Sequence, residues 1–173
     1  MTTNEINNLI GALANGDKTA LERLYEEMSK PVFFYALRLC QVPDIAEDVM
    51  QETFLTVWNK AASFDKTNGR AWLFTIAKNK TIDRLRAQNR QAALQEDCAV
   101  GGDSIEGALS DMAFFQMLAP LSEKERDVVS LRLFSGLTLT ETAAELGIPK
   151  GTVFWLYNTA IKKLRKAEGG ERR

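Results

Sequence analysis

The chain has 173 residues, enough for one large domain or two small ones. Its composition, 45% hydrophobic and 26% charged, is typical of a soluble globular protein, and it contains no histidine. The lack of histidine excludes Ser-His-Asp and Cys-His catalytic arrangements and removes a major metal ligand. No phosphate-binding or dinucleotide-type glycine motif occurs. We therefore expect that the chain is not an enzyme and that it has no cofactor, metal site or small-molecule substrate.

Membrane and redox signals are weak. No apolar run approaches the roughly 18 residues needed to cross a membrane, and residues 1–13 lack the basic start and apolar stretch of a signal peptide. We expect a cytoplasmic protein that is not inserted in a membrane. Cys40 and Cys98 match no metal or redox spacing, so we expect reduced thiols. The net charge of −1 is unusual for a protein that binds DNA alone, so DNA binding would be local or helped by a partner.

Helical periodicity recurs along the chain and strand signals are almost absent, which predicts an all-α fold. The first predicted helical stretch begins near Asp17, after the breaker Asn15-Gly16, and ends near Cys40. Pro31 is expected to kink or restart it. Its apolar face comprises Leu21, Leu24, Tyr25, Met28, Val32, Tyr35 and Leu39.

The next helix is predicted to open at Pro43, where Asp44 and Glu47 have the spacing of a capping box. Its buried stripe is expected to contain Ile45, Val49, Phe54, Val57, Trp58 and Ala61. A loop over residues 63–69 follows, and a third helix starts at Arg70, with Leu73, Ile76, Ala77 and Leu85 facing inward. The same helix carries the bases Lys78, Lys80, Arg84, Arg86 and Arg90, with Asp83 as the one acid among them.

Residues 91–112 differ in character, because they are rich in acids and include Gly101-Gly102. We interpret them as a flexible acidic linker, the alternative being a long surface loop within one domain. The linker divides the chain into two small helical domains, residues 1–90 and 113–173.

The second domain has the pattern of a helix-turn-helix. Ser122 with Glu125, and Thr138 with Glu141, have capping-box spacing, and Gly147 suits a left-handed turn position. A last helix runs from about residue 150 to 167. In this motif the second helix enters the major groove of duplex DNA. The residues expected nearest the DNA are Lys150, Gly151, Thr152, Phe154, Trp155, Asn158, Lys162 and Lys163. The alternative is an ordinary helical hairpin that ends in a solvated basic helix.

Two segments in this order resemble a known family. Residues 46–90 contain AEDVMQETF and WLFTIAKN, and residues 121–166 contain LGIPKGTV. Together they resemble the extracytoplasmic-function sigma factors of the sigma-70 family. The resemblance implies a bacterial RNA polymerase sigma factor that directs promoter recognition, DNA melting and transcription initiation.

The resemblance also implies partners and site residues. Asp48, Gln51 and Glu52 would bind the clamp helices of the largest polymerase subunit. The −10 element would be captured as single-stranded DNA by Phe64, Asp65, Lys66, Asn68, Arg70, Lys78, Lys80, Arg84 and Arg86. The C-terminal domain would read the −35 element of promoter DNA, near the β flap of core RNA polymerase. An anti-sigma factor is a further implied partner.

The last helix departs from the family pattern. Phe154 and Trp155 stand where many members carry basic or small polar residues. They could contact thymine methyl groups or sugar, pack on a protein partner, or leave −35 reading weak. Two other functions are therefore alternatives: a polymerase-associated accessory subunit with weak −35 reading, and a stand-alone helix-turn-helix regulator.

Overall fold

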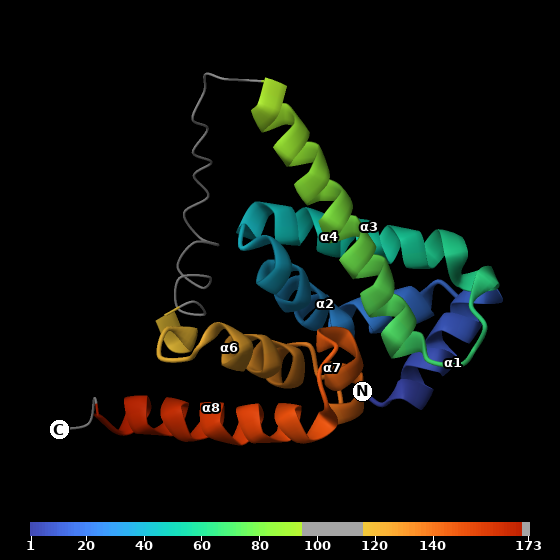
Figure 1. Ribbon diagram of the computed structural model, residues 1–173. Helices are drawn as coiled ribbons and strands as arrows, with labels where there is room; N and C mark the ends of the chain where they lie inside the picture. The colour runs from blue at the N-terminus through green and yellow to red at the C-terminus, as the bar shows by residue number, and fades with distance from the viewer. Residues whose placement is uncertain (95–115, 171–173) are drawn as a thin grey trace. The chain divides into compact units, whose positions relative to one another are not determined.

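The computed structural model describes residues 1–94 and 116–170, and Figure 1 labels its helices. The regular elements of these residues are all helical, which confirms the all-α prediction. They form two compact units, one with α1 to α4 and the other with α6 to α8. The predicted linker 91–112 lies outside the described residues, except for residues 91–94, which continue α4 instead.

The first unit begins with α1 (Thr3–Ala14), a helix that was not predicted. A capping box starts it, because the Glu5 N–H donates to Thr2 Oγ1 at 3.3 Å and the Thr2 N–H donates to the Glu5 carboxylate at 2.6 Å. Ile6, Leu9, Ile10 and Leu13 are buried at helical spacing. Both signals are visible in the sequence, so this helix could have been found.

Helix α2 (Thr19–Cys40) is continuous through Pro31, so of the two expected effects of this proline, a kink or a restart, the restart does not occur. Its N-cap is Lys18, while Asp17 accepts a hydrogen bond from the Thr19 N–H at 3.0 Å. Leu24 and Tyr35 are fully buried as expected. Tyr25 is exposed, because it lies at the edge of the apolar face of α2. There its ring centroid is 4.9 Å from that of Phe54.

Helix α3 (Pro43–Lys60) opens differently from the prediction. Its N-cap is Val42, which offers no side-chain hydrogen bond, and Pro43 lies in the first turn, so Asp44 does not cap the helix. Val49 and Val57 are buried, but Trp58 is exposed. It lies at the edge of the stripe near the end of α3, where Lys18 Nζ is 5.9 Å from its ring centroid.

A 3₁₀ turn, η1 (Ala61–Ser63), and a loop lead to α4 (Gly69–Leu94). Leu73 and Ala77 are fully buried, and Ile76 and Leu85 are half-buried. The second half of α4 projects beyond the other helices of this unit (Figure 1), and Arg86 to Arg90 are exposed. The first half of α4 is therefore anchored in the core of this unit, and its exposed second half carries basic side chains.

The second unit contains α6 (Glu123–Val129), a π-helical turn η2 (Ser130–Phe134), α7 (Leu139–Leu146) and α8 (Lys150–Gly170). Both predicted capping boxes are present. Gly147 ends α7 in the left-handed conformation, with φ of 64°, as predicted. Val128, Val153 and Leu156 form the core, against which the turn residue Ile148 packs. The arrangement of α7 and α8 confirms the helix-turn-helix.

Candidate nucleic-acid interface

The candidate polymerase residues lie on one face of α3. Asp48, Gln51 and Glu52 recur at spacings of three and four, and each is at least partly exposed. Leu55 continues this face and is 63% exposed. Sequence analysis missed Leu55, although an apolar residue in phase with a polar face is a signal of an interface. The face combines acidic groups with an unburied aliphatic side chain, as protein interfaces do.

Ion pairs connect this face to α4. Glu52 Oε1 accepts a hydrogen bond from Arg84 Nη2, and Glu52 Oε2 lies 3.4 Å from Lys80 Nζ. Arg84 Nη1 also lies 3.5 Å from Asp48 Oδ2. The hydrogen bond from Arg84 holds the pKa of Glu52 below its ordinary value. Candidate polymerase-binding acids and candidate DNA-binding bases are thus in direct contact.

Two residues expected at the single-stranded DNA are buried. Phe64 is 7% exposed, and its ring lies 5.2 Å from that of Trp72, which is half-buried. Arg70 is 8% exposed, and its Nη2 donates to the Met1 carbonyl. Since these side chains contact protein, neither offers a surface to DNA in this structure. Phe64 is thus more deeply buried than Trp72.

The other loop residues have distinct roles. The Asp65 carboxylate accepts from the Thr67 N–H at 3.0 Å and the Thr67 hydroxyl at 2.8 Å, which lowers the pKa of Asp65. Asn68 Oδ1 accepts from the Ala71 N–H at 3.0 Å and caps the first turn of α4. Lys66 is exposed and has φ of 63°. Among the expected loop residues it is the charge best placed to meet a phosphate.

The basic side chains of α4 differ in their exposure and in their ion pairs within the protein. Lys78 and Lys80 are half-buried, whereas Arg84 and Arg86 are exposed. Arg86 makes only a long contact with Asp83, 3.8 Å between Nη1 and Oδ1. A weak surface ion pair of this kind exchanges easily for a phosphate. Arg86 is therefore more accessible to nucleic acid than Lys80 or Arg84.

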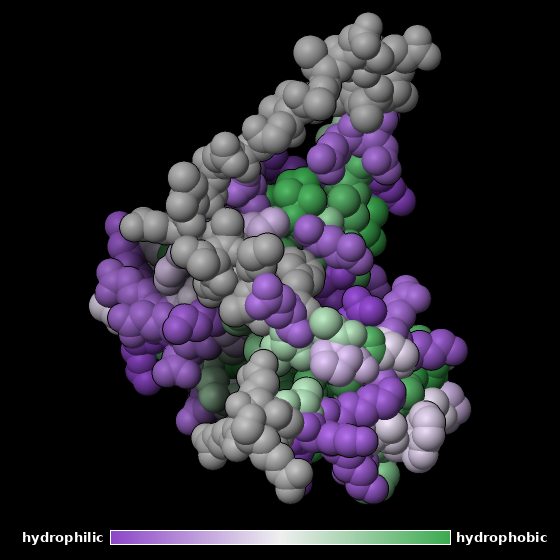
Figure 2. Space-filling model, turned by 90° about the vertical axis from the view of Figure 1, so that its left-hand side faces the viewer, coloured by the Kyte–Doolittle hydropathy of each residue, from purple (hydrophilic) through white to green (hydrophobic). Residues whose placement is uncertain are grey.

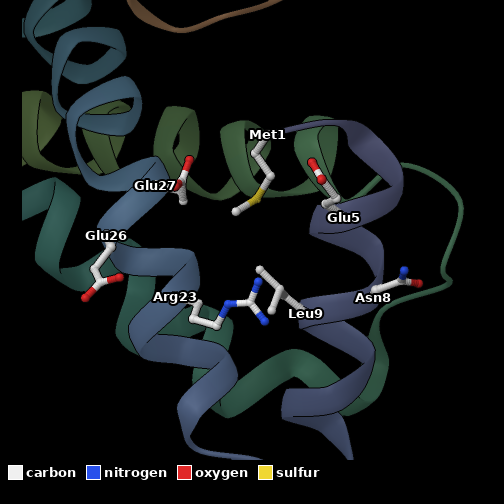
Figure 3. Close-up of a pocket in the computed structure, with 7 residues that line it drawn as sticks. All are labelled: Met1, Glu5, Asn8, Leu9, Arg23, Glu26 and Glu27. Atoms are coloured by element: carbon white, nitrogen blue, oxygen red, sulfur yellow. The ribbon is translucent and has the colours of Figure 1, made fainter.

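An acidic cleft of about 420 Å³ lies between α1 and α2 in the same unit (Figure 3). Glu5, Glu26 and Glu27 border it, and the Arg23 side chain extends across it toward Leu9. Three carboxylates against one guanidinium disfavour a phosphate backbone. The cleft therefore does not belong to the candidate nucleic-acid interface.

The helix-turn-helix exposes the expected DNA face of α8. Lys150, Gly151, Thr152, Phe154, Trp155, Asn158 and Lys162 are all exposed. Phe154 is 57% and Trp155 63% exposed, because Val153 and Leu156 take the buried side of the same helix. Asn158 Nδ2 donates to the Phe154 carbonyl at 2.8 Å, a bond it must exchange to reach a base.

Lys163 has a partner within the protein. Its Nζ lies 2.8 Å from Glu125 Oε2, and the same oxygen accepts from the Ser122 N–H at 2.8 Å. These contacts hold the pKa of Glu125 below its ordinary value, with the bond from Lys163 as the largest cause. Glu125 therefore caps α6 and also ties α8 to it, and Lys163 is less free for DNA than Lys162.

The described surface can also be compared with what a membrane span or a metal site would require. The face shown in Figure 2 is mainly hydrophilic with smaller hydrophobic areas. Across the described part of the chain, no helix is long and apolar enough to cross a membrane. In the same residues, no group of three or more Cys, Asp or Glu is placed to hold a metal ion.

Family comparisons agree with this arrangement. Residues 24–91 match the model for Sigma-70 region 2, and residues 117–166 match the model for Sigma-70 region 4. The first match spans α3, the loop and the basic part of α4, and the second spans the helix-turn-helix. The chain therefore has the two conserved regions of a sigma-70-type transcription initiation factor.

Relatives narrow the family. The ECF RNA polymerase sigma factor SigL of Mycobacterium tuberculosis is 31% identical over 90% of this chain and 93% of its own length. SigK of Mycobacterium ulcerans is 27% identical over 94% of this chain and 93% of its own length. The chain belongs to the extracytoplasmic-function (ECF) RNA polymerase sigma factors. It is an RNA polymerase sigma factor that functions in promoter recognition and transcription initiation.

Solved structures show the same fold. CnrH, in complex with the cytosolic domain of CnrY, matches with a TM-score of 0.62 and 25% identity over 96% of this chain and 98% of its own. RpoE of Bartonella quintana, in complex with the anti-sigma factor NepR, matches with a TM-score of 0.58 and 26% identity, covering 87% of this chain and 98% of its own.

Proposed function

We propose that this sigma factor divides its work among three surfaces. The α3 face of Asp48, Gln51, Glu52 and Leu55 docks on the clamp helices of core polymerase. The loop at Lys66 and the exposed bases of α4 hold the melted −10 strand. The exposed face of α8 contacts the −35 duplex, near the β flap. The two-domain division at 1–90 and 113–173 remains part of this proposal, with α4 extended to Leu94.

One observation carries the proposal: α3 and α4 present an acidic face and a basic face side by side, joined at Glu52 and Arg84. A polymerase-docking surface next to a phosphate-binding surface brings the DNA strand to the enzyme that copies it. Phosphate contacts by exposed bases give sequence-independent affinity for single-stranded DNA. The chain itself supplies contacts, and the polymerase supplies the chemistry.

Partners and location follow from the same role. The chain acts in the cytoplasm with core polymerase and promoter DNA, and it needs no small molecule. Because CnrH is seen in complex with the cytosolic domain of CnrY, and RpoE in complex with the anti-sigma factor NepR, we propose that an anti-sigma factor also regulates this chain.

A second candidate is an accessory subunit that binds polymerase without reading the −35 element. Phe154 and Trp155 favour it, because exposed aromatic side chains at the start of a recognition helix suit a protein partner as well as DNA. A stand-alone regulator explains only α6 to α8 and leaves the match to region 2 without a role.

The test compares matched variants in reconstituted holoenzyme. Asp48→Ala with Leu55→Ala should weaken binding to core polymerase, measured by fluorescence titration. Arg86→Ala should leave that binding intact, but weaken single-stranded −10 DNA binding and reduce its salt slope by about 0.7. Arg70→Ala, the buried counterpart, should instead lower thermal stability. The assignment would be overturned if Arg86→Ala lost binding to core polymerase, or if Asp48→Ala with Leu55→Ala kept it.

A further inference from the structure

One side chain of α1 holds the backbone of the loop before α4. The Gly69 N–H donates to Asn7 Oδ1 at 2.6 Å, and Asn7 Nδ2 donates to the carbonyls of Lys66 and Thr67, each at 3.4 Å. Asn7 thus provides partners for three backbone groups within residues 66–69. Backbone groups without a regular helical partner need such bonds to keep one conformation.

The held segment contains an unusual backbone conformation. Lys66 has φ of 63°, in the left-handed region that side chains other than glycine rarely adopt. Such a conformation persists when its surroundings fix it, and it recurs at functional sites. The amide of Asn7 holds the Lys66 carbonyl and so helps to keep the backbone conformation from which the exposed Lys66 side chain projects.

Gly69 shows how closely α1 approaches the loop. A Cβ atom at this position would lie 2.7 Å from Asn7 Oδ1 and 2.9 Å from side-chain carbons of Ile6 and Ile10. Contacts this short force the loop or the helix to move. Arg70 provides a second connection, because its guanidinium donates to the Met1 carbonyl. Met1, just before α1, and the middle of α1 both contact the start of α4, and a glycine allows the fit.

We propose that Asn7 is a positioning residue for capture of the −10 strand. It touches no DNA in this scheme. It holds residues 66–69 so that Lys66 and the start of α4 meet the strand in one arrangement. This inference rests on the proposed role of the loop, and it gives α1 a part in promoter opening that lies before the segment matched to region 2.

The experiment uses full-length chain in holoenzyme on a promoter with a fluorescent base in the −10 element. Asn7→Ala removes all three bonds, Asn7→Asp keeps the acceptor for Gly69, and Gly69→Ala crowds the contact. Asn8→Ala, an exposed neighbour in α1, is the matched control. The readouts are core affinity, the rate of strand opening, and the preference among the four bases at the captured position.

We expect Asn7→Ala and Gly69→Ala to slow opening about tenfold and to flatten base preference, with core affinity unchanged. Asn7→Asp should fall between them and wild type, and Asn8→Ala should match wild type. A lower melting temperature with normal opening and normal base preference would mean that Asn7 only stabilises the fold, and would overturn the inference. Failure of the wild-type holoenzyme to open any promoter would instead overturn the proposed function.

Discussion

Glu52 of α3 is paired with Arg84 of α4, and Lys80 lies on the other carboxylate oxygen at 3.4 Å. The pair joins two surfaces that we assign to different macromolecules. We expect that, when polymerase engages the Glu52 carboxylate, Lys80 and Arg84 lose this ion pair and become more available to phosphate. We expect this exchange to couple docking on polymerase to binding of DNA.

Glu52→Gln tests this coupling. Removing the carboxylate charge should weaken core binding and raise the affinity of the isolated chain for single-stranded DNA about threefold at low salt, because Lys80 and Arg84 each lose an ion pair, although Asp48 stays beside Arg84. Glu26→Gln makes the same charge change at an exposed position of α2. Fluorescence anisotropy measures both affinities. If the affinity for single-stranded DNA rose equally in both variants, the change in net charge alone would explain it, and this would contradict the coupling.

Glu125 should give the second unit a pH-dependent stability. Its pKa is depressed by Lys163 and Ser122, so its stabilising contribution is complete above the ordinary value of 4.5 and is lost as the pH falls through the depressed pKa. Glu125→Gln should cost about 1 kcal/mol near neutral pH, and less in acid. Urea unfolding at two pH values measures this.

Glu123→Gln is the control for that experiment, since Glu123 is exposed in the same turn of α6. A loss in Glu125→Gln that is the same at neutral and acid pH would show that packing, rather than the charged contact with Lys163, explains the effect.

Phe154 and Trp155 should matter for DNA and little for stability. Replacing both with alanine should change the free energy of unfolding by less than about 1 kcal/mol, because both are exposed. Leu156→Ala, which empties a core position, should cost about 2–5 kcal/mol. Footprinting of the −35 region by holoenzyme should weaken in the double variant. A normal footprint in the double variant would show that these two side chains do not contact the −35 duplex, and no −35 footprint by the wild-type holoenzyme would favour the accessory-subunit alternative.

Two glycines of the helix-turn-helix should respond to alanine with opposite signs. Gly147 has φ of 64° and open space around a Cβ, so Gly147→Ala is strained and should cost about 1 kcal/mol. Gly151 lies in the first turn of α8, with open space around a Cβ and without a positive φ, so Gly151→Ala should stabilise by up to about 1 kcal/mol. Thermal unfolding measures both. Stabilisation in both variants would refute the turn geometry.

The sequence predicts most of the described fold, since periodicity, the two capping boxes and Gly147 locate α2 to α4 and α6 to α8 closely. The failures have local causes. Helix α1 was passed over although Thr2 and Glu5 cap it, and Pro43 displaced the predicted cap at Asp44. At the site, residue type indicated that bases and acids would be present. It could not show which of them pair inside the protein, because that depends on helices meeting across 30 or more residues.

Arg70 illustrates that limit. Next to a loop expected to bind DNA, an arginine suggests a phosphate contact, yet here its partner is the Met1 carbonyl, at the other end of the unit's sequence. Asn7 shows the converse, since no sequence pattern marks an asparagine in an unpredicted helix as the residue that fixes the loop.

Transcription in vitro is the most direct test that this chain directs RNA polymerase to start at promoters. Core bacterial polymerase and this chain would be incubated with a library of genomic fragments, and the RNA starts mapped by sequencing. We predict discrete starts that depend on the chain and share motifs at both −10 and −35. Binding to core polymerase without any chain-dependent start would contradict the account.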